Sequence, residues 1–598
     1  MAEAMVLLAF DLFENQNYLF FRLIASKNYH SQKYNAALYL YRHSFFILAS
    51  KPETDLLVLS QDLHRISRTL RRLRDFSAAL EIYSVVLELY EQQDYYTHDY
   101  ISTVNQCMDT YWEQGTPDLA LISLQQIEER LARNSKFPIK LRIALIQSEA
   151  DQYARGNKLP KAAQALRKAF KLHKEMAKPS IALENRLISH RSNLKKHSGD
   201  YAGALNDLSL LLERYRGSGN IHSESYLLPS VGFLQRVLGD FNASLRSYER
   251  SLELSEKITW ENELERSEFE AFVINNIGIV HTALGNFPKA LNAYQTSLDL
   301  SKKAKRLKNH AYALGGFGWV SFEQHDYKKA KKYYEEAIEM FSRIPWAKPP
   351  VPVLISMAET EMQLSQPNWE KRVLKLIAEA EEIAEHTSSG VDKVRAKLGR
   401  ASMTARKGRI EGALHMCSDG HRLARENGFF EGKVTSQLLT ARICIEALVN
   451  PQMVPTSDLI GVALNSLKKA QSYAKTAGAF PLVLEALNAE SAVREAMEDF
   501  TTALAIQKHA LDLAQSSGVP SSRYQTEIEK LETFQKLQSM YEVAKSRPGD
   551  TSTPMTMKDT LTYLQEAFRI LRAYSASHSE VKESRNPKFS SLNGSNSL

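Results

Sequence analysis

Cysteine is scarce in this chain, with only Cys107, Cys417 and Cys444 among 598 residues. Three cysteines cannot form a disulfide framework, and these three do not have the spacing of metal ligands. We therefore expect a protein of the reducing intracellular compartments, cytoplasmic or nuclear, that holds neither a metal nor another cofactor.

Glycine, proline and long apolar runs are also scarce. The 25 glycines and 19 prolines fall well below the roughly 12% of average usage, which disfavours turn-rich all-β architectures. No run approaches the roughly 18 apolar residues that span a bilayer, and residues 1–15 lack the basic start and long apolar stretch of a signal peptide. Because 43% of the residues are apolar, the chain can bury a large core, and we expect a long helical protein.

Sequence motifs of catalysis are absent as well. The chain has no G-x-x-x-x-G-K-[ST], H-E-x-x-H or G-x-S-x-G motif. Gly315 and Gly318 resemble part of a nucleotide-binding loop, but they lie inside a predicted helix. His415 and Cys417 would point about 200° apart on a helix, so they cannot share a metal ion. We predict that the protein is not an enzyme.

A repeat of about 40 residues runs through most of the chain. Its core is a glycine or polar residue, a polar residue, an aromatic or aliphatic residue, two variable residues, a small residue, and leucine or an equivalent. The small residue recurs at positions 37, 79, 120, 162, 204, 244, 290, 330, 413, 463 and 503, mostly in steps of 40 to 42. Such a period indicates a repeat architecture rather than separate globular domains.

Each copy predicts a helix, a turn and a second helix. Apolar residues upstream of Gly285 recur at i, i+3, i+4 and i+7, which is typical of a helix, and the small residue Gly278 among them lets a neighbouring helix approach closely. Gly285 ends that helix with little backbone strain. In the second helix, Ala290 lies where two helices cross and Tyr294 fills the space beside it. One hairpin cannot cover its own apolar face, so the copies must stack into a solenoid.

These residues resemble the tetratricopeptide repeats. In the family pattern a glycine precedes the turn glycine by seven residues, an alanine follows the turn by five, and a second small residue lies seven further on. The copies that fit are Gly278, Gly285, Ala290 and Ser297; Gly318, His325, Ala330 and Ala337; and Gly232, Gly239, Ser244 and Ser251. The resemblance implies an all-α, right-handed superhelical solenoid of about 11 or 12 antiparallel helical hairpins. Because the period exceeds the family's usual 34 residues, the chain resembles the long-repeat subgroup of LGN-like, MalT-like and anaphase-promoting-complex or cohesin-loader scaffold arrays.

The pattern divides the chain into five parts. A repeat array is predicted over residues 1–518 and a capping helix over 519–545. A flexible linker is expected at 546–556, where Pro548, Gly549 and Pro554 disfavour a helix. Residues 557–575 are predicted to form an amphipathic helix and the polar residues 576–598 to be disordered. Within the array, the prolines of 450–455 predict a loop.

The resemblance also implies an inner groove. In tetratricopeptide arrays the first helix of each hairpin lines this groove through its second, fifth, ninth and twelfth positions. Carried onto three consecutive copies, the pattern predicts a partner-binding groove formed by Tyr226, Phe233, Arg236, Phe272, Asn275, Asn276, Tyr312, Trp319 and Phe322. The rings offer an apolar surface to an extended or helical peptide, and an asparagine can both donate to and accept from its backbone. The alternative is that the rings pack on an adjacent repeat.

Basic residues gather in two neighbouring copies. They are Lys302, Lys303, Lys305, Arg306, Lys328, Lys329, Lys331 and Lys332. Together they can form a basic edge for an acidic segment or a nucleic-acid backbone, or they can simply be a solvated face offset by nearby glutamates. A second cluster includes Arg65, Arg68 and Arg72, which share one helix face.

The function indicated by these features is a non-catalytic scaffold or adaptor. Its concave groove would bind segments of partner proteins, and the chain would be a subunit of a multi-protein complex. The partners are expected to be proteins, with no small-molecule cofactor, no membrane insertion and no nucleic acid. The alternatives are a regulator that senses a peptide or small ligand, and a nucleic-acid-associated repeat protein.

Overall fold

The computed structural model describes residues 18–546, apart from positions 32, 52–53, 133, 135, 261, 345–346, 388, 450–456 and 518–520. The predicted loop at 450–455, the linker after Ser546, the amphipathic helix at 557–575 and the tail at 576–598 lie outside these residues. Every regular element of the described residues is a helix, and the 25 helices α2 to α26 confirm the predicted all-α fold. The chain divides into two compact units, residues 1–197 and 198–598.

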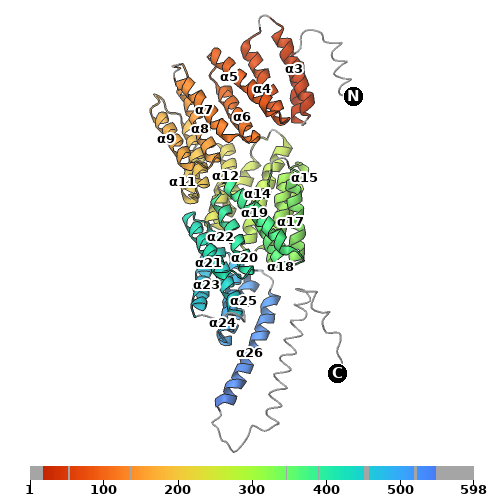
Figure 1. The fold of residues 1–598 in the computed structure, drawn as a ribbon, viewed down its shortest axis with the longest axis vertical. Helices are drawn as coiled ribbons and strands as arrows, with labels where there is room; N and C mark the ends of the chain where they lie inside the picture. The colour runs from red at the N-terminus through yellow and green to blue at the C-terminus, as the bar shows by residue number, and fades with distance from the viewer. Residues whose placement is uncertain are drawn as a thin grey trace, which may run out of the picture. The chain divides into compact units, whose positions relative to one another are not determined.

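The first unit contains four hairpins and one further helix (Figure 1). Its helices are α2 (Tyr18–His30), α3 (Tyr34–Ala49), α4 (Leu56–Arg72), α5 (Phe76–Gln92), α6 (His98–Gln114), α7 (Pro117–Ala132), α8 (Ile139–Arg155), α9 (Leu159–Lys174) and α10 (Ile181–His197). The two helices of each hairpin pack side by side, and each hairpin packs on the next.

The second unit begins with α11, continues with seven hairpins and ends with α26. Its first seven helices are α11 (Tyr201–Gly217), α12 (Ile221–Leu238), α13 (Phe241–Ser255), α14 (Glu263–Ala283), α15 (Phe287–Lys303), α16 (Leu307–Glu323) and α17 (Tyr327–Ser342). The others are α18 (Val351–Leu364), α19 (Trp369–Thr387), α20 (Gly390–Arg406), α21 (Ile410–Glu426), α22 (Phe430–Val449), α23 (Ser457–Ala477), α24 (Phe480–Ala496), α25 (Phe500–Ser517) and α26 (Ser522–Ser546). The right-handed sense and a single array over residues 1–518 stay predictions.

Glycine and a capping residue form the turn within a hairpin. Gly239 follows the end of α12 with φ 94°, in the left-handed region that glycine adopts without strain. Asp240 then accepts a hydrogen bond of 2.9 Å from the backbone N–H of Ala243 at the start of α13. Asp200 and Asp326 cap α11 and α17 in the same way. The glycine-polar pair of the sequence repeat is therefore a helix end followed by a helix start.

Tyr294 shows why the repeat requires small residues. Its ring is fully buried and lies against Gly278 of its own hairpin and Gly316 of the next. A Cβ atom at Gly278 would lie 2.6 Å from Cε1 of Tyr294, closer than side chains approach one another. The predicted close helix contact at Gly278 is confirmed, and Gly316 extends it to the neighbouring hairpin.

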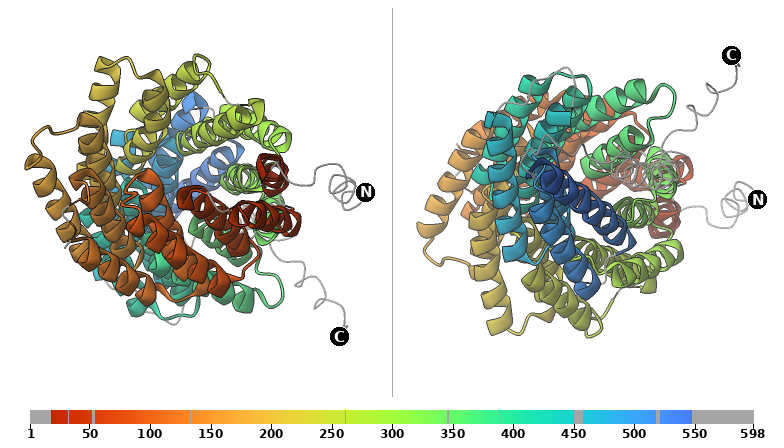
Figure 2. Two further views of the ribbon diagram at one scale, coloured as in Figure 1. Left: turned by 90° about the horizontal axis from the view of Figure 1, so that it is seen from above. Right: turned by 90° about the horizontal axis from the view of Figure 1, so that it is seen from below.

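The first helices of the hairpins form the inner wall of the second unit. Consecutive members of the series α12, α14, α16, α18, α20, α22 and α24 contact each other, and no comparable contact joins consecutive second helices in the described residues. The more closely spaced row of a curved array lies on its inside. In Figure 2 the helices of this unit, coloured yellow to blue, accordingly follow a curved path.

The second unit also winds back onto itself. The backbone N–H of Val391 donates to the hydroxyl of Tyr201, which lies 190 residues earlier, at 3.2 Å. The rings of Phe241 and Phe430 meet edge to face with centroids 5.6 Å apart. Through such contacts the starts of second helices meet the starts of first helices one superhelical turn later, and α22 lies beside α12 (Figure 1). The inner row of helices therefore lies in a chain that also contacts itself across about 190 residues.

Candidate functional site

The nine predicted groove residues lie on three consecutive helices of the inner wall, α12, α14 and α16. They do not form one apolar stripe. Tyr226 belongs to an aromatic cluster near the start of α12, with ring centroids 4.9 Å from Phe269 and 5.9 Å from Trp260. Trp260 and Phe269 also contact each other at 5.4 Å. Tyr226 is nevertheless 39% exposed, so one side of this cluster is open.

Two of the predicted rings pack within their own repeat. Tyr312 meets Phe341 edge to face at 5.4 Å, and Phe322 meets Tyr327 in the same way at 5.4 Å. Both contacts join α16 to α17. These two ring contacts lie inside one hairpin, so they are not the packing on an adjacent repeat that the alternative describes.

The other rings keep part of their surface exposed. The indole N–H of Trp319 donates to Oε1 of Glu323 at 3.0 Å. The guanidinium carbon of Arg236 lies 5.4 Å from the centre of the Phe233 ring, and Phe272 is 45% exposed. A ring with free surface can receive an apolar group of a ligand. These three rings are therefore the strongest aromatic candidates for contact with a partner.

The two asparagines of α14 have different environments. Nδ2 of Asn276 donates to the carbonyl oxygen of Phe272 at 2.9 Å, within the same helix. Asn275 is only 5% exposed, and its Oδ1 has no hydrogen-bond partner among the described residues. A buried acceptor without a partner costs about 1–3 kcal/mol, which a donor from a ligand would recover. Asn275 is therefore the better candidate for a ligand contact.

Carboxylates on four helices of the inner wall were missed by the sequence-based prediction. They are Glu323 of α16, Glu359 of α18, Glu431 of α22 and Glu485 of α24. Burial raises the pKa of Glu323 to about 7, and the charge of Glu485 adds to this rise. Burial also raises the pKa of Glu359 to about 7, where Glu485 and Glu431 add to the rise and Arg442 opposes it. Because charges interact over short distances, these mutual effects indicate that the four carboxylates lie near one another on the inner wall.

Only part of this acidic wall is neutralised. Arg395 pairs with Glu431 at 2.7 Å, and Arg442 lies 3.8 Å from Glu485. Neither Glu323 nor Glu359 has an ion-pair partner anywhere in the described part of the chain. Glu323 and Glu359 are therefore the carboxylates of this wall that form no ion pair in the described chain, and they become fully charged only above about pH 7.

One sequence signal pointed to this wall. Glu323, Glu359, Arg395 and Glu431 follow one another at intervals of 36 residues. This interval is shorter than the step between the small residues, so the series looks like ordinary surface charge on a helical protein. Glu485 lies outside the series, and its proximity to Glu323 depends on the winding of the superhelix.

Comparison with known families identifies the repeat. Residues 269–343, which run from α14 to α17, match the family model described as tetratricopeptide repeat. Residues 269–343 therefore contain tetratricopeptide repeats. This match confirms the family resemblance; the long-repeat subgroup stays a prediction. No curated protein matches the sequence.

Several solved structures of low identity are similar to the chain. The APC/C hetero-tetramer Cut9-Hcn1 matches at 12% identity with a TM-score of 0.46, over 93% of this chain and 94% of that chain. The Rap protein complexed with Competence and Sporulation Factor matches at 14% identity with a TM-score of 0.42, over 63% and 99%. The apo quorum sensor NprR from B. thuringiensis matches at 11% identity with a TM-score of 0.39, over 62% and 99%.

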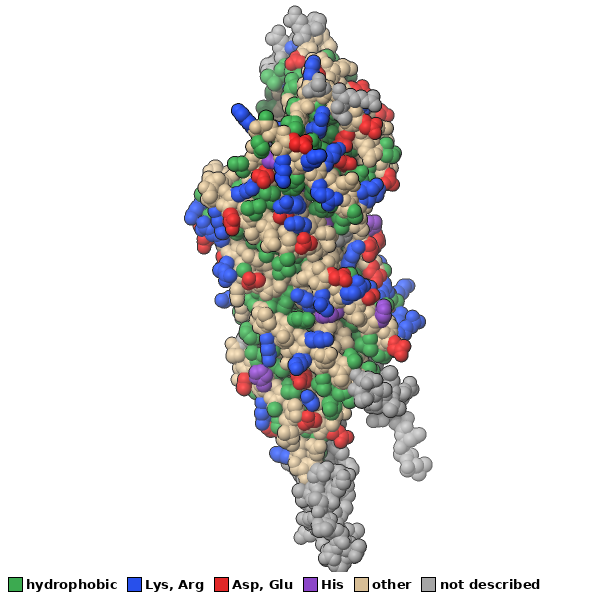
Figure 3. All heavy atoms as spheres, turned by 90° about the vertical axis from the view of Figure 1, so that its left-hand side faces the viewer, with side chains coloured by type: hydrophobic (Ala, Val, Ile, Leu, Met, Phe, Trp, Pro, Cys, Tyr) green, Lys and Arg blue, Asp and Glu red, His purple; other side chains and the backbone are tan. Residues whose placement is uncertain are grey.

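The predicted basic edge of these tetratricopeptide repeats divides into two groups. Lys303, Arg306 and Lys331 form ion pairs of 2.9, 2.6 and 2.9 Å with glutamates of neighbouring helices. The exposed residues without an ion pair in the described chain are Lys302, Lys305, Lys328, Lys329 and Lys332. On the face of the molecule drawn in Figure 3, basic and acidic side chains are likewise interspersed. A role for the edge in binding stays a prediction.

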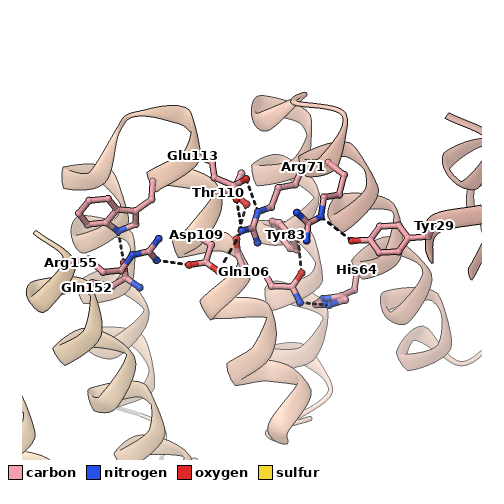
Figure 4. Close-up of polar contacts among 12 residues, drawn as sticks. Tyr29, His64, Arg71, Tyr83, Gln106, Asp109, Thr110, Glu113, Gln152 and Arg155 are labelled. Atoms are coloured by element: carbon pink, nitrogen blue, oxygen red, sulfur yellow. Dashed lines mark hydrogen bonds and ion pairs between the residues drawn. The ribbon is translucent and has the colours of Figure 1, made fainter. Parts of the chain in front are cut away.

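The inner helices of the first unit carry a row of polar contacts between repeats (Figure 4). Arg71 of α4 makes two hydrogen bonds of 2.8 and 2.9 Å to the carboxylate of Glu113 on α6. Arg155 of α8 pairs with Asp109 of α6 at 2.5 Å. Burial lowers the pKa of His64 to about 4, so this ring is neutral at physiological pH. The contacts of Arg71 and Arg155 join consecutive repeats.

In the described residues no three or more His, Cys, Asp or Glu side chains are grouped so that they could hold a metal ion. Cys107, Cys417 and Cys444 are buried, and burial raises the pKa of Cys417 to about 12, which keeps its thiol protonated. Among the described helices, none has the length and apolar character needed to cross a membrane.

Proposed function

We propose that this chain is a non-catalytic scaffold or adaptor and a subunit of a larger assembly. Its working surface is the inner groove of the second unit, which binds segments of partner proteins. One observation carries the proposal: the partly exposed ring of Trp319 lies beside Glu323, in a wall where Glu323 and Glu359 have no ion-pair partner among the described residues. Such a wall can bury apolar and polar groups of the same peptide.

The enclosure of the groove supports binding of a narrow ligand. Contacts such as those between Tyr201 and Val391 and between Phe241 and Phe430 hold successive turns together. A wall that is already ordered loses little conformational entropy when a ligand binds. An extended or helical segment would enter from an end of the groove or between turns that separate transiently, whereas a folded domain would remain outside.

The proposed place of action is the cell interior. The three cysteines are unpaired and buried, and the high pKa of Cys417 keeps that thiol unreactive. A protein that carries free thiols and no disulfide among its described residues fits a reducing compartment. Nuclear and cytoplasmic sites fit equally well.

Site-specific photo-crosslinking tests the proposal. A benzoylphenylalanine at position 319 should capture partner proteins in cell extract, whereas the same group at position 46 should not. Phe46 lies on α3 of the first unit and is 65% exposed, so it controls for accessibility. Trp319→Ala combined with Phe233→Ala should release the same partners, and Phe46→Ala should retain them. Partners that crosslink to position 46 and not to position 319 would refute the groove as the binding surface.

A further inference from the structure

The inner groove of the second unit has an unbalanced charge. Four glutamates from α16, α18, α22 and α24 influence one another there, and the two arginines beside them already pair with Glu431 and Glu485. The remaining two, Glu323 and Glu359, form no ion pair among the described residues, although Arg442 and Arg395 are close enough to Glu359 to lower its pKa. Both side chains are only partly exposed, so bulk water screens their charge incompletely.

The two carboxylates lie on adjacent helices of the inner wall. Glu323 is the last residue of α16, and Glu359 lies in α18, which contacts α16 directly. Glu485 of α24 raises the pKa of both. A cation bound between Glu323 and Glu359 would therefore also be attracted by Glu485.

A separate observation on a neighbouring helix also points to a ligand. Asn275 of α14 is 5% exposed, and its Oδ1 has no partner in the described structure. α14 contacts α16, so Asn275 belongs to the same inner wall as Glu323. An amide oxygen and two carboxylates are all hydrogen-bond acceptors. The complementary ligand carries N–H donors and positive charge.

The aromatic residue in this part of the wall fits the same ligand. The Trp319 indole donates to Glu323, which fixes the ring beside the carboxylate, and the ring remains partly exposed. A tryptophan face attracts a lysine ammonium or an arginine guanidinium through a cation–π interaction. A metal ion is a poorer candidate, because the described residues contain no group of three suitable ligands. Nucleic acid would be repelled by the carboxylates.

We propose that the groove binds a basic segment of a partner protein, with a lysine or arginine side chain held between Glu323 and Glu359 beside Trp319. The proposal rests on the proposed function, since it names the kind of segment that the groove takes. Asn275 would accept a hydrogen bond from the segment's backbone. The expected consensus is therefore a basic residue flanked by an apolar one that contacts the exposed rings.

A random dodecapeptide library displayed on phage and selected on the full-length protein at pH 8 tests this inference. Enriched peptides are then synthesised with a fluorescent label and titrated by anisotropy. The decisive variant is Glu323→Gln combined with Glu359→Gln, which removes two charges with little change in shape. Its matched control is Glu213→Gln combined with Glu249→Gln, two exposed glutamates on the outer helices α11 and α13.

We expect the selection to enrich peptides that contain lysine or arginine. Their affinity should fall about tenfold or more in the groove variant and less than about twofold in the control. Peptides that are not basic, or that bind the groove variant as tightly as the natural protein, would overturn this inference. If the non-basic or charge-insensitive peptides still lose affinity for the Trp319→Ala variant, the groove remains the binding surface and only the preference for basic segments is wrong. A failure to enrich any peptide would contradict both.

Discussion

The rings of Phe241 and Phe430 meet edge to face with centroids 5.6 Å apart, although they begin helices of hairpins a full superhelical turn from each other. Gly239, two residues before Phe241, lies against the same Phe430 ring. The contact converts a stack in which each repeat touches only its neighbours into a coil whose successive turns support each other. The proposed groove would owe its enclosure to such contacts.

Replacing Gly239 by alanine tests this contact between turns. The residue has φ 94°, and an added Cβ would lie 2.7 Å from Cγ of Phe430. Gly408→Ala is the matched control, because Gly408 has φ 73° and nothing within 4 Å of an added Cβ. We expect the control to lose about 1 kcal/mol of unfolding free energy through backbone strain and Gly239→Ala to lose about 2–4 kcal/mol.

Hydrogen exchange locates the effect of these two variants. Gly239→Ala should accelerate amide exchange at the start of α22, one superhelical turn away, whereas Gly408→Ala should disturb only its own hairpin. Equal losses of stability in the two variants, with no change in α22, would show that the turns do not support each other.

The buried ion-pair cluster of Glu361 provides a second prediction. Glu361 is fully buried and pairs with Lys331 at 2.9 Å and with Arg372 at 2.6 Å. Burial favours a higher pKa for Glu361, but hydrogen bonds from Arg372 and Lys331 outweigh it and lower the pKa. Glu361→Gln should reduce the unfolding free energy by about 2 kcal/mol, because it leaves Arg372 without its anion and Lys331 with only Glu335, 3.8 Å away.

The control for Glu361 is a glutamate of an exposed ion pair. Glu382 pairs with Lys348 at 2.6 Å, and its side chain is 57% exposed. Glu382→Gln should change the unfolding free energy by less than about 0.5 kcal/mol. Urea unfolding followed by circular dichroism compares the two variants, and a loss of similar size in both would contradict the structural role of Glu361.

The pH dependence of stability reports on the acidic wall. Burial raises the pKa of Glu323 and of Glu359 from 4.5 to about 7. The folded chain therefore keeps protons that the unfolded chain releases near pH 4.5, so these two groups make stability fall as pH rises from about 4.5 to 7. The charged groups that face them are Glu431, Glu485, Arg395 and Arg442, and the hydroxyl of Tyr334, whose pKa burial raises well above 10, is a neutral neighbour.

Glu323→Gln should consequently stabilise the protein at pH 8 by about 1–2 kcal/mol and have little effect at pH 5. Glutamine can still accept the hydrogen bond from Trp319, so the change isolates the charge. Thermal unfolding at the two pH values measures the difference. A stabilisation that is equal at pH 5 and pH 8, or a destabilisation at pH 8, would show that Glu323 is not held in a charge-poor environment.

The repeat itself could be predicted because its determinants are local. Gly278, Gly285 and Ala290 specify a close approach, a turn and a helix crossing within one hairpin, and the structure places Tyr294 in the space they leave. The spacing of such residues is visible in any single copy. Counting the copies gives the number of hairpins, and the position of a helix before or after the turn says whether it is the first or second helix of its hairpin.

The groove was harder to predict because its composition depends on curvature. Tyr312 and Trp319 both occupy groove positions of α16 in the family pattern, yet only Trp319 lies beside Glu323 while Tyr312 packs on Phe341. The nearness of Glu323 to Glu485 depends on how far each repeat rotates relative to the last. That small angle accumulates over several hairpins and has no signature in one copy of the repeat.

The most direct test of the account is a fluorine NMR measurement on full-length protein labelled with 5-fluorotryptophan. Resonances of Trp319 and Trp112 are assigned by replacing each with phenylalanine, and a basic dodecapeptide from the selection is then titrated in at pH 8. The account predicts a saturable shift of the Trp319 resonance, abolished by Glu323→Gln with Glu359→Gln, and no shift of Trp112 in the first unit. A peptide that binds while the Trp319 resonance stays unchanged would contradict it.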